Sequence, residues 1–277
     1  MNQLPPVIDI VPPAKWRLPD LRELYEFREL LYTLTWRDIR VMYKQTIIGA
    51  PWAILQPLLL MIIYTLVFGL ILRVPTNEIP YTLFIFAGLL GWNFFATGIM
   101  RASTSVLANA NLVRKVYFPH LLLPVAAVFG GIIDLIPALL LSLLLALVYG
   151  FLPTWNLFSI VPTLILLLIT TLGVGFWVAA LLTKYRDVSI ALPLILQILF
   201  YVSPVLYTSS LFGETWRILM GIFPVSVIVE SFRWSLTSTG EPPLLITSII
   251  AWCSAFLILV GGMLFFQRMD PEFVDLV

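Results

Sequence analysis

The chain has 277 residues, of which 60% are hydrophobic and only 11% are charged, and its mean hydropathy is +1.00. A soluble domain carries about a quarter charged residues, so the composition excludes an ordinary soluble protein and indicates a membrane protein. A net charge of +1 leaves no large basic surface for nucleic acid, and the single cysteine, Cys253, excludes an intrachain disulfide.

Two pieces of different character open the chain. Residues 1–18 are proline-rich and carry acids from Asp9 onward, which predicts an extended tail instead of a cleavable signal. The pattern of residues 19–34 predicts an amphipathic helix. Residues 19–50 as a whole are predicted to form a cytosolic interface region. The apolar positions of the helix recur every three or four residues, at Leu24, Phe27, Leu31 and Leu34. Such a helix either packs on the bundle as a solubilising element or lies on the membrane surface and also contacts a partner.

A basic stripe lies between this helix and the first apolar run. Arg37, Arg40 and Lys44 stand at i, i+3 and i+7, so they share one helical face, and Tyr43 lies beside them. That face meets the bilayer at the level where an anionic lipid head would sit. In the alternative interpretation these charges only set the topology and bind no ligand.

Long runs without any charged residue predict the membrane-spanning part. These runs are 45–72, 79–100, 135–183, 188–213 and 242–267. About 20 apolar residues cross a bilayer, so 135–183 is too long for one span, and it breaks at the turn-rich, aromatic stretch 150–156. The sequence therefore predicts an all-α polytopic membrane protein whose transmembrane domain, 51–267, has six spans. The predicted spans are 51–73, 80–102, 121–149, 158–183, 187–207 and 243–267.

The distribution of basic residues predicts the orientation. With both termini inside, thirteen of the sixteen Lys and Arg residues lie inside and three lie outside. This bias fits the positive-inside rule and predicts a cytosolic N-terminus and a cytosolic C-terminal tail at 268–277.

The segment 109–124, NANLVRKVYFPHLLLP, is a short basic element between two apolar runs. It predicts a compact cytosolic loop, 103–120, that can receive force from another protein. Asn109 and Asn111 are typical of helix caps and turns. The lone His120 at the boundary is expected to be hydrogen-bonded and to have no catalytic role.

The outside segment 208–242 is too long for a plain turn. The apolar pattern of 216–235 predicts two short re-entrant helices broken at Pro224. Glu230 and Arg233 are i, i+3 neighbours and can pair. If the pair is buried, it would help to hold an outer gate closed. If it is exposed to water, it would contribute little to the stability of the gate.

Asp134 is the one acid in the interior of a predicted span. Intramembrane acids are costly and usually face the protein interior. The residue is either a proton-coupling group or the acceptor of a structural hydrogen bond. The scarcity of other ionisable groups in the spans favours the hydrogen bond.

Five motifs together resemble the permease subunits of type-2 ABC exporters of polysaccharide, and most of all those of O-antigen export. In chain order they are WRDIRVMYKQTIIGAPWAILQP at 36–57, LFIFAGLLGWNFF at 83–95, NANLVRKVYFPHLLLP at 109–124, KYRDV at 184–188 and SPVLY at 203–207. The similarity covers about residues 20–267. The tail 1–18 and the ends of 208–242 are not matched.

The resemblance implies a homodimer of permeases that works with two copies of a cytosolic ABC ATPase in the bacterial cytoplasmic (inner) membrane. It implies export of a glycan linked to undecaprenyl pyrophosphate through a continuous channel. The sequence has no GxxxxGK[ST] phosphate loop. We therefore expect a transport subunit that is not an enzyme and holds no cofactor or metal, with ATP and Mg bound by the partner ATPase.

The resemblance also assigns roles to residues. The helix 20–34 and the loop helix 109–120 would contact the ATPase, with contacts expected at Asn109, Asn111, Arg114, Lys115 and Tyr117. The pyrophosphate would bind Arg37, Arg40, Tyr43 and Lys44, and the periplasmic gate would contain Glu230 and Arg233. An aromatic wall lets a glycan slide, although a lipid-facing aromatic residue would look the same in the sequence. The expected channel residues are Trp52, Tyr64, Phe68, Phe200, Tyr201 and Tyr207.

Other functions remain open at this point. The chain can serve a capsule or teichoic-acid exporter, or act as a stand-alone secondary flippase for lipid-linked sugars or as a membrane-embedded transferase. The near-absence of ionisable residues in the spans disfavours the flippase and the transferase. An ATPase encoded beside this chain would separate these classes. The sugar repeat and its chain length are not encoded in any recognisable pattern.

Overall fold

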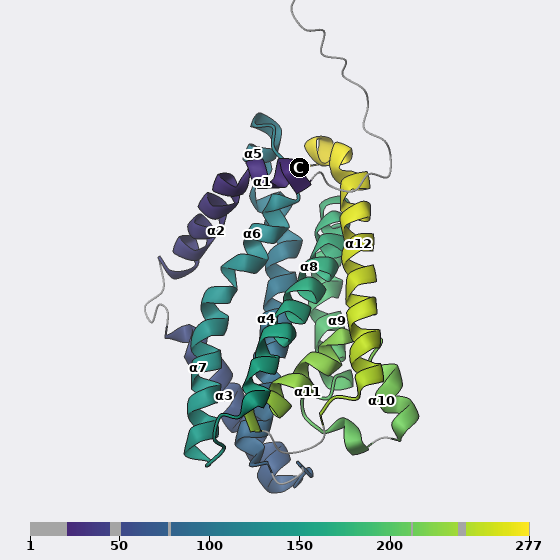
Figure 1. The fold of residues 1–277 in the computed structure, drawn as a ribbon. Coiled ribbons are helices and arrows are strands. Elements are labelled where there is room, and N and C mark those ends of the chain that lie inside the picture. Colours follow the sequence, from purple (N-terminus) through teal and green to yellow (C-terminus); the bar gives the residue numbers. More distant parts are fainter. Residues whose placement is uncertain (1–20, 45–50, 77–78, 212, 238–241, 277) are drawn as a thin grey trace, which may run out of the picture.

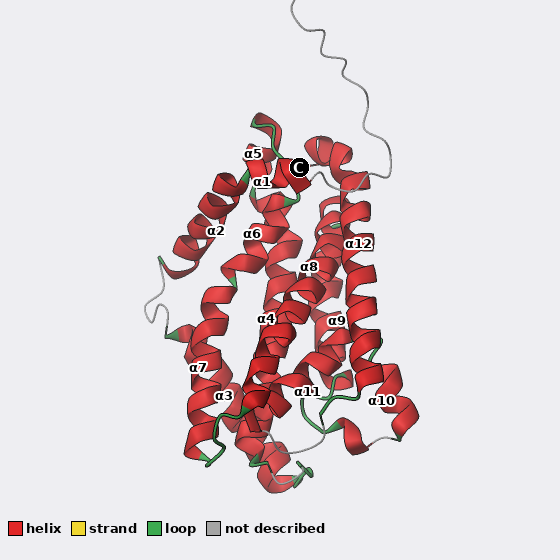
Figure 2. Ribbon diagram, in the orientation of Figure 1, coloured by secondary structure: helices red, strands yellow, loops and turns green. Residues whose placement is uncertain are grey.

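The computed structural model describes residues 21–44, 51–76, 79–211, 213–237 and 242–276, and every regular element in these residues is a helix (Figure 1, Figure 2). In chain order the elements are α1 (Leu21–Glu26), α2 (Arg28–Tyr43), α3 (Trp52–Tyr64), the π-helical η1 (Thr65–Ile71), α4 (Tyr81–Ala108), α5 (Ala110–Lys115), α6 (Leu122–Gly130), α7 (Ile132–Val148), the 3-10 turn η2 (Trp155–Ser159), α8 (Ile160–Lys184), α9 (Val188–Val202), the 3-10 turn η3 (Ser209–Leu211), α10 (Glu214–Met220), α11 (Pro224–Thr237) and α12 (Leu245–Leu276).

Five helical stretches are long and apolar enough to cross a membrane, and they correspond to five of the six predicted spans. They are Ile54–Ile71, Tyr81–Ala108, Leu122–Val148, Trp155–Lys184 and Leu245–Phe273. The predicted span 187–207 is different, because α9 ends at Val202. Its 15 residues rise only about 22 Å, less than the roughly 30 Å of a hydrocarbon core. The chain becomes extended at Ser203 (ψ 147°) because the following Pro204 disfavours a helical residue before it.

The bundle has two distinct ends. Figure 1 shows α1, α5 and the last turns of α12 together at the top, which we call the α5 end, and α10 with α11 at the bottom, which we call the α11 end. The helices α4, α8 and α12 run between these ends. The α5 end carries the loop that the sequence analysis singled out, and the α11 end carries the predicted gate segment.

α4 is the central helix of the bundle. It packs against α3, α6, α7, α8 and α11, and 78% of its most apolar stretch is buried. By contrast, only 6% of the corresponding stretch of α3 and η1 is buried. Apart from Met61 in the first span and Leu192, Leu196 and Phe200 in α9, the described hydrophobic side chains of these two segments are exposed or only partly buried.

α8 and α12 are joined by a very close backbone approach. A Cβ atom on Gly173 would lie 2.8 Å from the backbone nitrogen of Leu259, and one on Gly262 would lie 2.5 Å from the carbonyl oxygen of Gly173. Small residues let helices in a membrane approach in this way, and the contact is then held by dispersion because lipid offers no hydrophobic drive. A side chain at either position would separate the two spans.

Two expected elements differ in detail from the structure, and a third agrees with it. The predicted helix 19–34 is two helices, since the chain turns at Phe27 (ψ 16°) and α2 then continues to Tyr43. The predicted third span, 121–149, is broken at Gly131 into α6 and α7. The segment 208–242 contains two helices, as expected, and Pro224 is the first residue of α11, where its missing N–H is harmless.

Candidate functional site

The basic stripe of α2 lines one groove. Arg37, Arg40 and Lys44 face a groove along the helix with a volume of about 820 Å³. The guanidinium of Arg37 donates to Asp38 Oδ1 from both Nε (3.1 Å) and Nη2 (2.7 Å), and Arg40 lies over the ring of Trp36 at 5.3 Å. The side chain of Tyr43 lies outside the described residues. The groove thus offers two exposed cations, Arg40 and Lys44, together with Arg37, whose charge is partly balanced by Asp38.

The loop after α4 is short and basic. α5 contains Arg114 and Lys115 in its last turn, and both side chains are exposed. Neither forms a hydrogen bond or an ion pair with any residue that the structure describes. The helix ends at Lys115, five residues earlier than the predicted 109–120. Asn109 holds the N-cap position but does not cap α5, because its Nδ2 donates to Ser105 O at 2.7 Å and so extends the hydrogen bonding of α4.

Two contacts tie residues 116–121 to other parts of the α5 end. Tyr117 is 83% exposed and its hydroxyl donates to Glu23 Oε1 of α1 at 3.2 Å. The negative charge of Glu23 raises the pKa of Tyr117, so the phenol stays protonated and remains a donor. His120 Nδ1 lies 2.6 Å from Asp270 Oδ1 of α12. A protein that moved α5 would therefore also pull on α1 and α12.

Most of the predicted channel aromatics form one cluster. The ring of Tyr64 lies 6.1 Å from Phe68 and 5.7 Å from Phe200, and Phe200 lies 5.4 Å from Tyr201. Phe200 is buried in this cluster, whereas Tyr201 is 53% exposed. Trp92, which the sequence analysis did not select, joins it at 5.4 Å from Phe200. The cluster therefore links α3, α4 and α9.

Two predicted channel residues lie apart from this cluster. Trp52 stands at the start of α3 and is 48% exposed. Tyr207 is half-buried and its hydroxyl donates to Val202 O at 2.6 Å, across the turn that follows α9.

The expected Glu230–Arg233 ion pair does not form within the described residues. Arg233 is 5% exposed and donates to four main-chain carbonyls. These bonds are Nε to Phe84 O (3.1 Å), Nη1 to Pro204 O (2.7 Å) and Tyr207 O (3.2 Å), and Nη2 to Val205 O (2.5 Å). The guanidinium also lies 3.5 Å above the ring of Phe84. Arg233 therefore holds the turn after α9 against α4, and Glu230 has no part in that contact.

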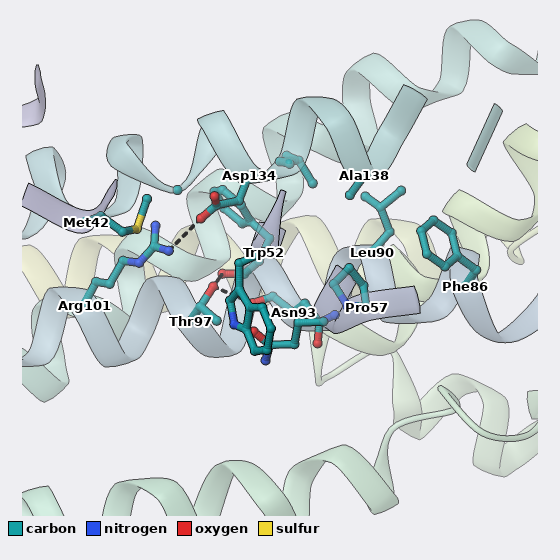
Figure 3. Close-up of a pocket in the computed structure, with 14 residues that line it drawn as sticks. Met42, Trp52, Pro57, Phe86, Leu90, Asn93, Thr97, Arg101, Asp134 and Ala138 are labelled. Atoms are coloured by element: carbon teal, nitrogen blue, oxygen red, sulfur yellow. Dashed lines mark hydrogen bonds and ion pairs between the residues drawn. The ribbon is translucent and has the colours of Figure 1, made fainter. Parts of the chain in front are cut away.

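An ion pair lies between two of the spans. Arg101 Nη2 of α4 donates to Asp134 Oδ2 of α7 at 2.6 Å, and both side chains are less than one-third exposed. A Cβ atom on Gly131 would lie 3.2 Å from Arg101 Nη1, so the glycine at the α6–α7 break leaves room for the guanidinium. Figure 3 shows the pair at one end of a cavity of about 180 Å³ between α3, α4 and α7. The structural role expected for Asp134 agrees with this contact.

The partner of Asp134 was not recognised from the sequence, where Arg101 counted only as an inside charge. The spacing of Asn93, Thr97 and Arg101 at i, i+4 and i+8 within an apolar helix is the signal that identifies it, because such residues share one face. The described residues contain no group of three or more His, Cys, Asp or Glu side chains that could hold a metal ion.

The fold and these features define a polytopic, all-helical membrane protein with a basic loop at one end and a cationic groove beside the first span. Residues 29–237 match the model of the ABC-2 type transporter family. The chain belongs to this family, which confirms the resemblance seen in the five motifs.

Several characterised proteins are similar over most of their length. An O-antigen export system permease protein RfbA from Myxococcus xanthus is 32% identical over 77% of this chain and 82% of its own length. A protein of the same name from Klebsiella pneumoniae is 28% identical over 90% of this chain and 95% of its own. The polysialic acid transport protein KpsM from Escherichia coli is 24% identical over 71% and 77%.

Proposed function

We propose that the chain is the channel-forming permease subunit of an ATP-driven exporter that moves an O-antigen-like polysaccharide, linked to undecaprenyl pyrophosphate, across the bacterial cytoplasmic membrane. The observation that carries the proposal is the nearly end-to-end similarity to permeases named for O-antigen export. The exposed cationic groove of α2 beside the first span supports a lipid-pyrophosphate substrate.

The proposed topology has six crossings with both termini in the cytosol. α9 and the turn after it form the fifth crossing, and α10 and α11 are re-entrant gate helices on the outer side. A second copy of the chain covers the exposed apolar faces of the first span and α9. Leu70, Ile71, Ile190 and Leu194 are examples, each at least 59% exposed. Tyr64 and Tyr201 would then line the channel beside this interface, with Phe200 packed behind them.

The ATPase is proposed to dock on α5 and α1, in two copies that bind ATP and Mg. Exposed Arg114 and Lys115 and the contacts of Tyr117 and His120 support this surface. A stand-alone flippase would work without that partner. Export that continues in liposomes containing the permease alone would favour the flippase and reject the ATP-driven exporter.

The headgroup is proposed to bind Arg37, Arg40 and Lys44, with Tyr43 adding a hydroxyl. Arg offers a bidentate fork to a phosphate, and Lys offers a point charge. Arg40→Ala should lower export about tenfold or more, since a charged hydrogen bond contributes about 1.5–3 kcal/mol. Arg40→Lys should recover only part of it, because the fork is lost.

The measurement is export of lipid-linked glycan together with membrane topology for each variant. Arg28→Lys, on the exposed surface of the same helix, is the matched control and should leave export unchanged. If the charges of α2 only set topology, Arg40→Lys will be fully active. Full export with unchanged topology in that variant rejects the headgroup site.

A second substrate class has its own support. The similarity to KpsM favours export of a capsular polysaccharide, although at lower identity than the O-antigen permeases. Complementation of two strains, one lacking an O-antigen permease and one lacking a capsule permease, separates the two. Restoration of the capsule alone would replace the O-antigen assignment.

A further inference from the structure

α4 carries a polar stripe through a predominantly apolar span. Asn93, Thr97 and Arg101 follow one another at i, i+4 and i+8 on the face that lines the 180 Å³ cavity (Figure 3). Polar side chains at membrane depth are costly and persist where they serve a function. Arg101 is paired with Asp134, but within the described part of the chain the side-chain amide of Asn93 makes no hydrogen bond. The stripe therefore has unused hydrogen-bonding capacity directed at the cavity.

The opposite wall supplies complementary groups. Trp52 and Gln56 of α3 line the same cavity as Asn93 and Thr97 (Figure 3). Within the described residues the amide of Gln56 also lacks a hydrogen-bond partner. The cavity thus combines an indole ring, two amides, a hydroxyl and an ion pair. It has volume for about six waters, taking roughly 30 Å³ for each.

The charges in this cavity disfavour an anion. Arg101 and Asp134 form a pair at 2.6 Å, so their charges nearly cancel. A phosphate approaching Arg101 would meet the carboxylate of Asp134 at short range, which is repulsive at low dielectric. Uncharged hydroxyls meet no such barrier: they accept from guanidinium and amide N–H groups and donate to carboxylate and amide oxygens. The apolar face of a sugar ring matches the face of Trp52.

We propose that this cavity, formed within a single protomer by α3, α4 and α7, binds an uncharged sugar ring of the transported glycan. The proposal rests on the proposed function, because it takes its substrate from glycan export. It places a sugar site away from the aromatic cluster of α3 and α9. Asn93, Gln56 and the Arg101–Asp134 pair bind the hydroxyls, and Trp52 stacks on the ring.

A second cavity lies between this site and the groove of α2. It has a volume of about 300 Å³, and it shares Met42 and Arg101 with the first cavity and Arg37 with the groove. The three hollows are therefore consecutive. With the lipid pyrophosphate at α2, the sugars nearest the lipid lie toward Arg101 and Asn93. The lipid pyrophosphate and the first sugars of the glycan thus bind to different, neighbouring parts of the protein surface.

Protection of a cysteine inside the cavity tests the proposal. In full-length protein carrying Cys253→Ser, Thr97→Cys reports the cavity, Tyr201→Cys reports the proposed channel, and Ser210→Cys in η3 is an exposed control. Each variant is reconstituted in nanodiscs and labelled with a hydrophilic maleimide. The probes are an uncharged hexose oligosaccharide and inorganic pyrophosphate. At a sugar concentration of about nine times its Kd, labelling of Thr97→Cys should slow about tenfold, because only one protein in ten is empty.

The other results decide against the site. Slowing by pyrophosphate alone identifies an anion site, labelling unaffected by either probe identifies a cavity that holds only water, and the absence of labelling identifies a dry cavity. Protection of Tyr201→Cys without protection of Thr97→Cys would leave the exporter function intact and overturn only the cavity site. Adding Asn93→Leu should abolish protection at Thr97→Cys, whereas Asn93→Gln should retain most of it. Equal protection in both would remove Asn93 from the site.

Discussion

The two ends of the bundle use positive charge in opposite ways. At the α11 end, Arg233 is buried and donates to four backbone carbonyls. At the α5 end, Arg114 and Lys115 are exposed, and neither has a hydrogen-bond partner within the described residues. Most N–H groups of the Arg233 guanidinium form hydrogen bonds within its own protomer. The charged groups of Arg114 and Lys115 in α5 are instead accessible to another molecule.

The difference separates a structural cation from exposed cations that the protomer leaves accessible. A buried charge is tolerated only when its hydrogen bonds are satisfied, and removing it then leaves several polar groups unpaired. An exposed charge contributes little to folding, as expected also for the Arg22–Glu26 pair, whose side chains are 87% and 61% exposed. The α11 end should therefore respond to substitution through stability and the α5 end through binding.

The largest effect is expected for Arg233→Leu. Four carbonyls in or near the turn after α9 lose their donor, and an unsatisfied buried group costs about 1–3 kcal/mol. The free energy of unfolding should fall by at least about 3 kcal/mol, seen as loss of monodisperse protein and a lower Tm. Arg233→Lys should restore only part of it, because one ammonium cannot reach the same acceptors.

Glu230→Gln is the control for that experiment. Because Arg233 does not depend on Glu230 for a hydrogen bond, this variant should stay within about 0.5 kcal/mol of the parent. A loss from Glu230→Gln as large as that from Arg233→Leu would mean that the two residues do act as a pair, and would restore the gate pairing expected from the sequence.

The next effect is expected for Arg114→Glu with Lys115→Glu. Reversing two exposed charges should leave folding unchanged. If the proposed partner surface complements the positive charges of α5, the reversal places like charges together, which costs several kcal/mol. ATPase co-purification should be lost, or hydrolysis uncoupled from export. Arg186→Glu, an exposed residue between α8 and α9, is the matched control and should retain the complex. A normal complex with normal export in the double variant would remove α5 from the docking surface.

The sequence predicted features that depend on neighbouring residues. Charge-free runs located five long spans, because crossing a bilayer is a requirement on composition. The spacing of Arg37, Arg40 and Lys44 placed these side chains on one groove, because helical periodicity is local. The same reasoning gave two helices in 208–242 with a break at Pro224.

Features that depend on contacts between residues far apart in the sequence were not predicted from the sequence. The role of Arg233 is set by contacts between α4, α11 and the turn after α9. The end of α9 at Val202 has a local cause, Pro204, which was overlooked in the predicted span 187–207. The spacing of Glu230 and Arg233 along one helix indicated a pair, but backbone carbonyls offered the guanidinium better acceptors. Gly131 leaves room for Arg101, a residue of another helix, and no local pattern indicates that contact.

The smallest effect sharpens the comparison at the α5 end, where Tyr117 contacts Glu23. The hydrogen bond is 3.2 Å long and Tyr117 is 83% exposed, so Tyr117→Phe should lower the free energy of unfolding by at most about 0.5 kcal/mol. Tyr25→Phe is the matched control, because the hydroxyl of Tyr25 makes no hydrogen bond within the described residues.

The pH dependence of this effect has a defined sign. Glu23 raises the pKa of Tyr117 above the ordinary value of 10.0. The contribution is therefore fully present below about pH 10 and is lost as the pH rises through the folded pKa. Thermal unfolding of both variants between neutral and alkaline pH measures it. A loss above about 2 kcal/mol at neutral pH would contradict a solvated contact, since only a bond shielded from water reaches that size. The α5 end would then resemble the α11 end, with α1 fixed to the loop before any partner binds.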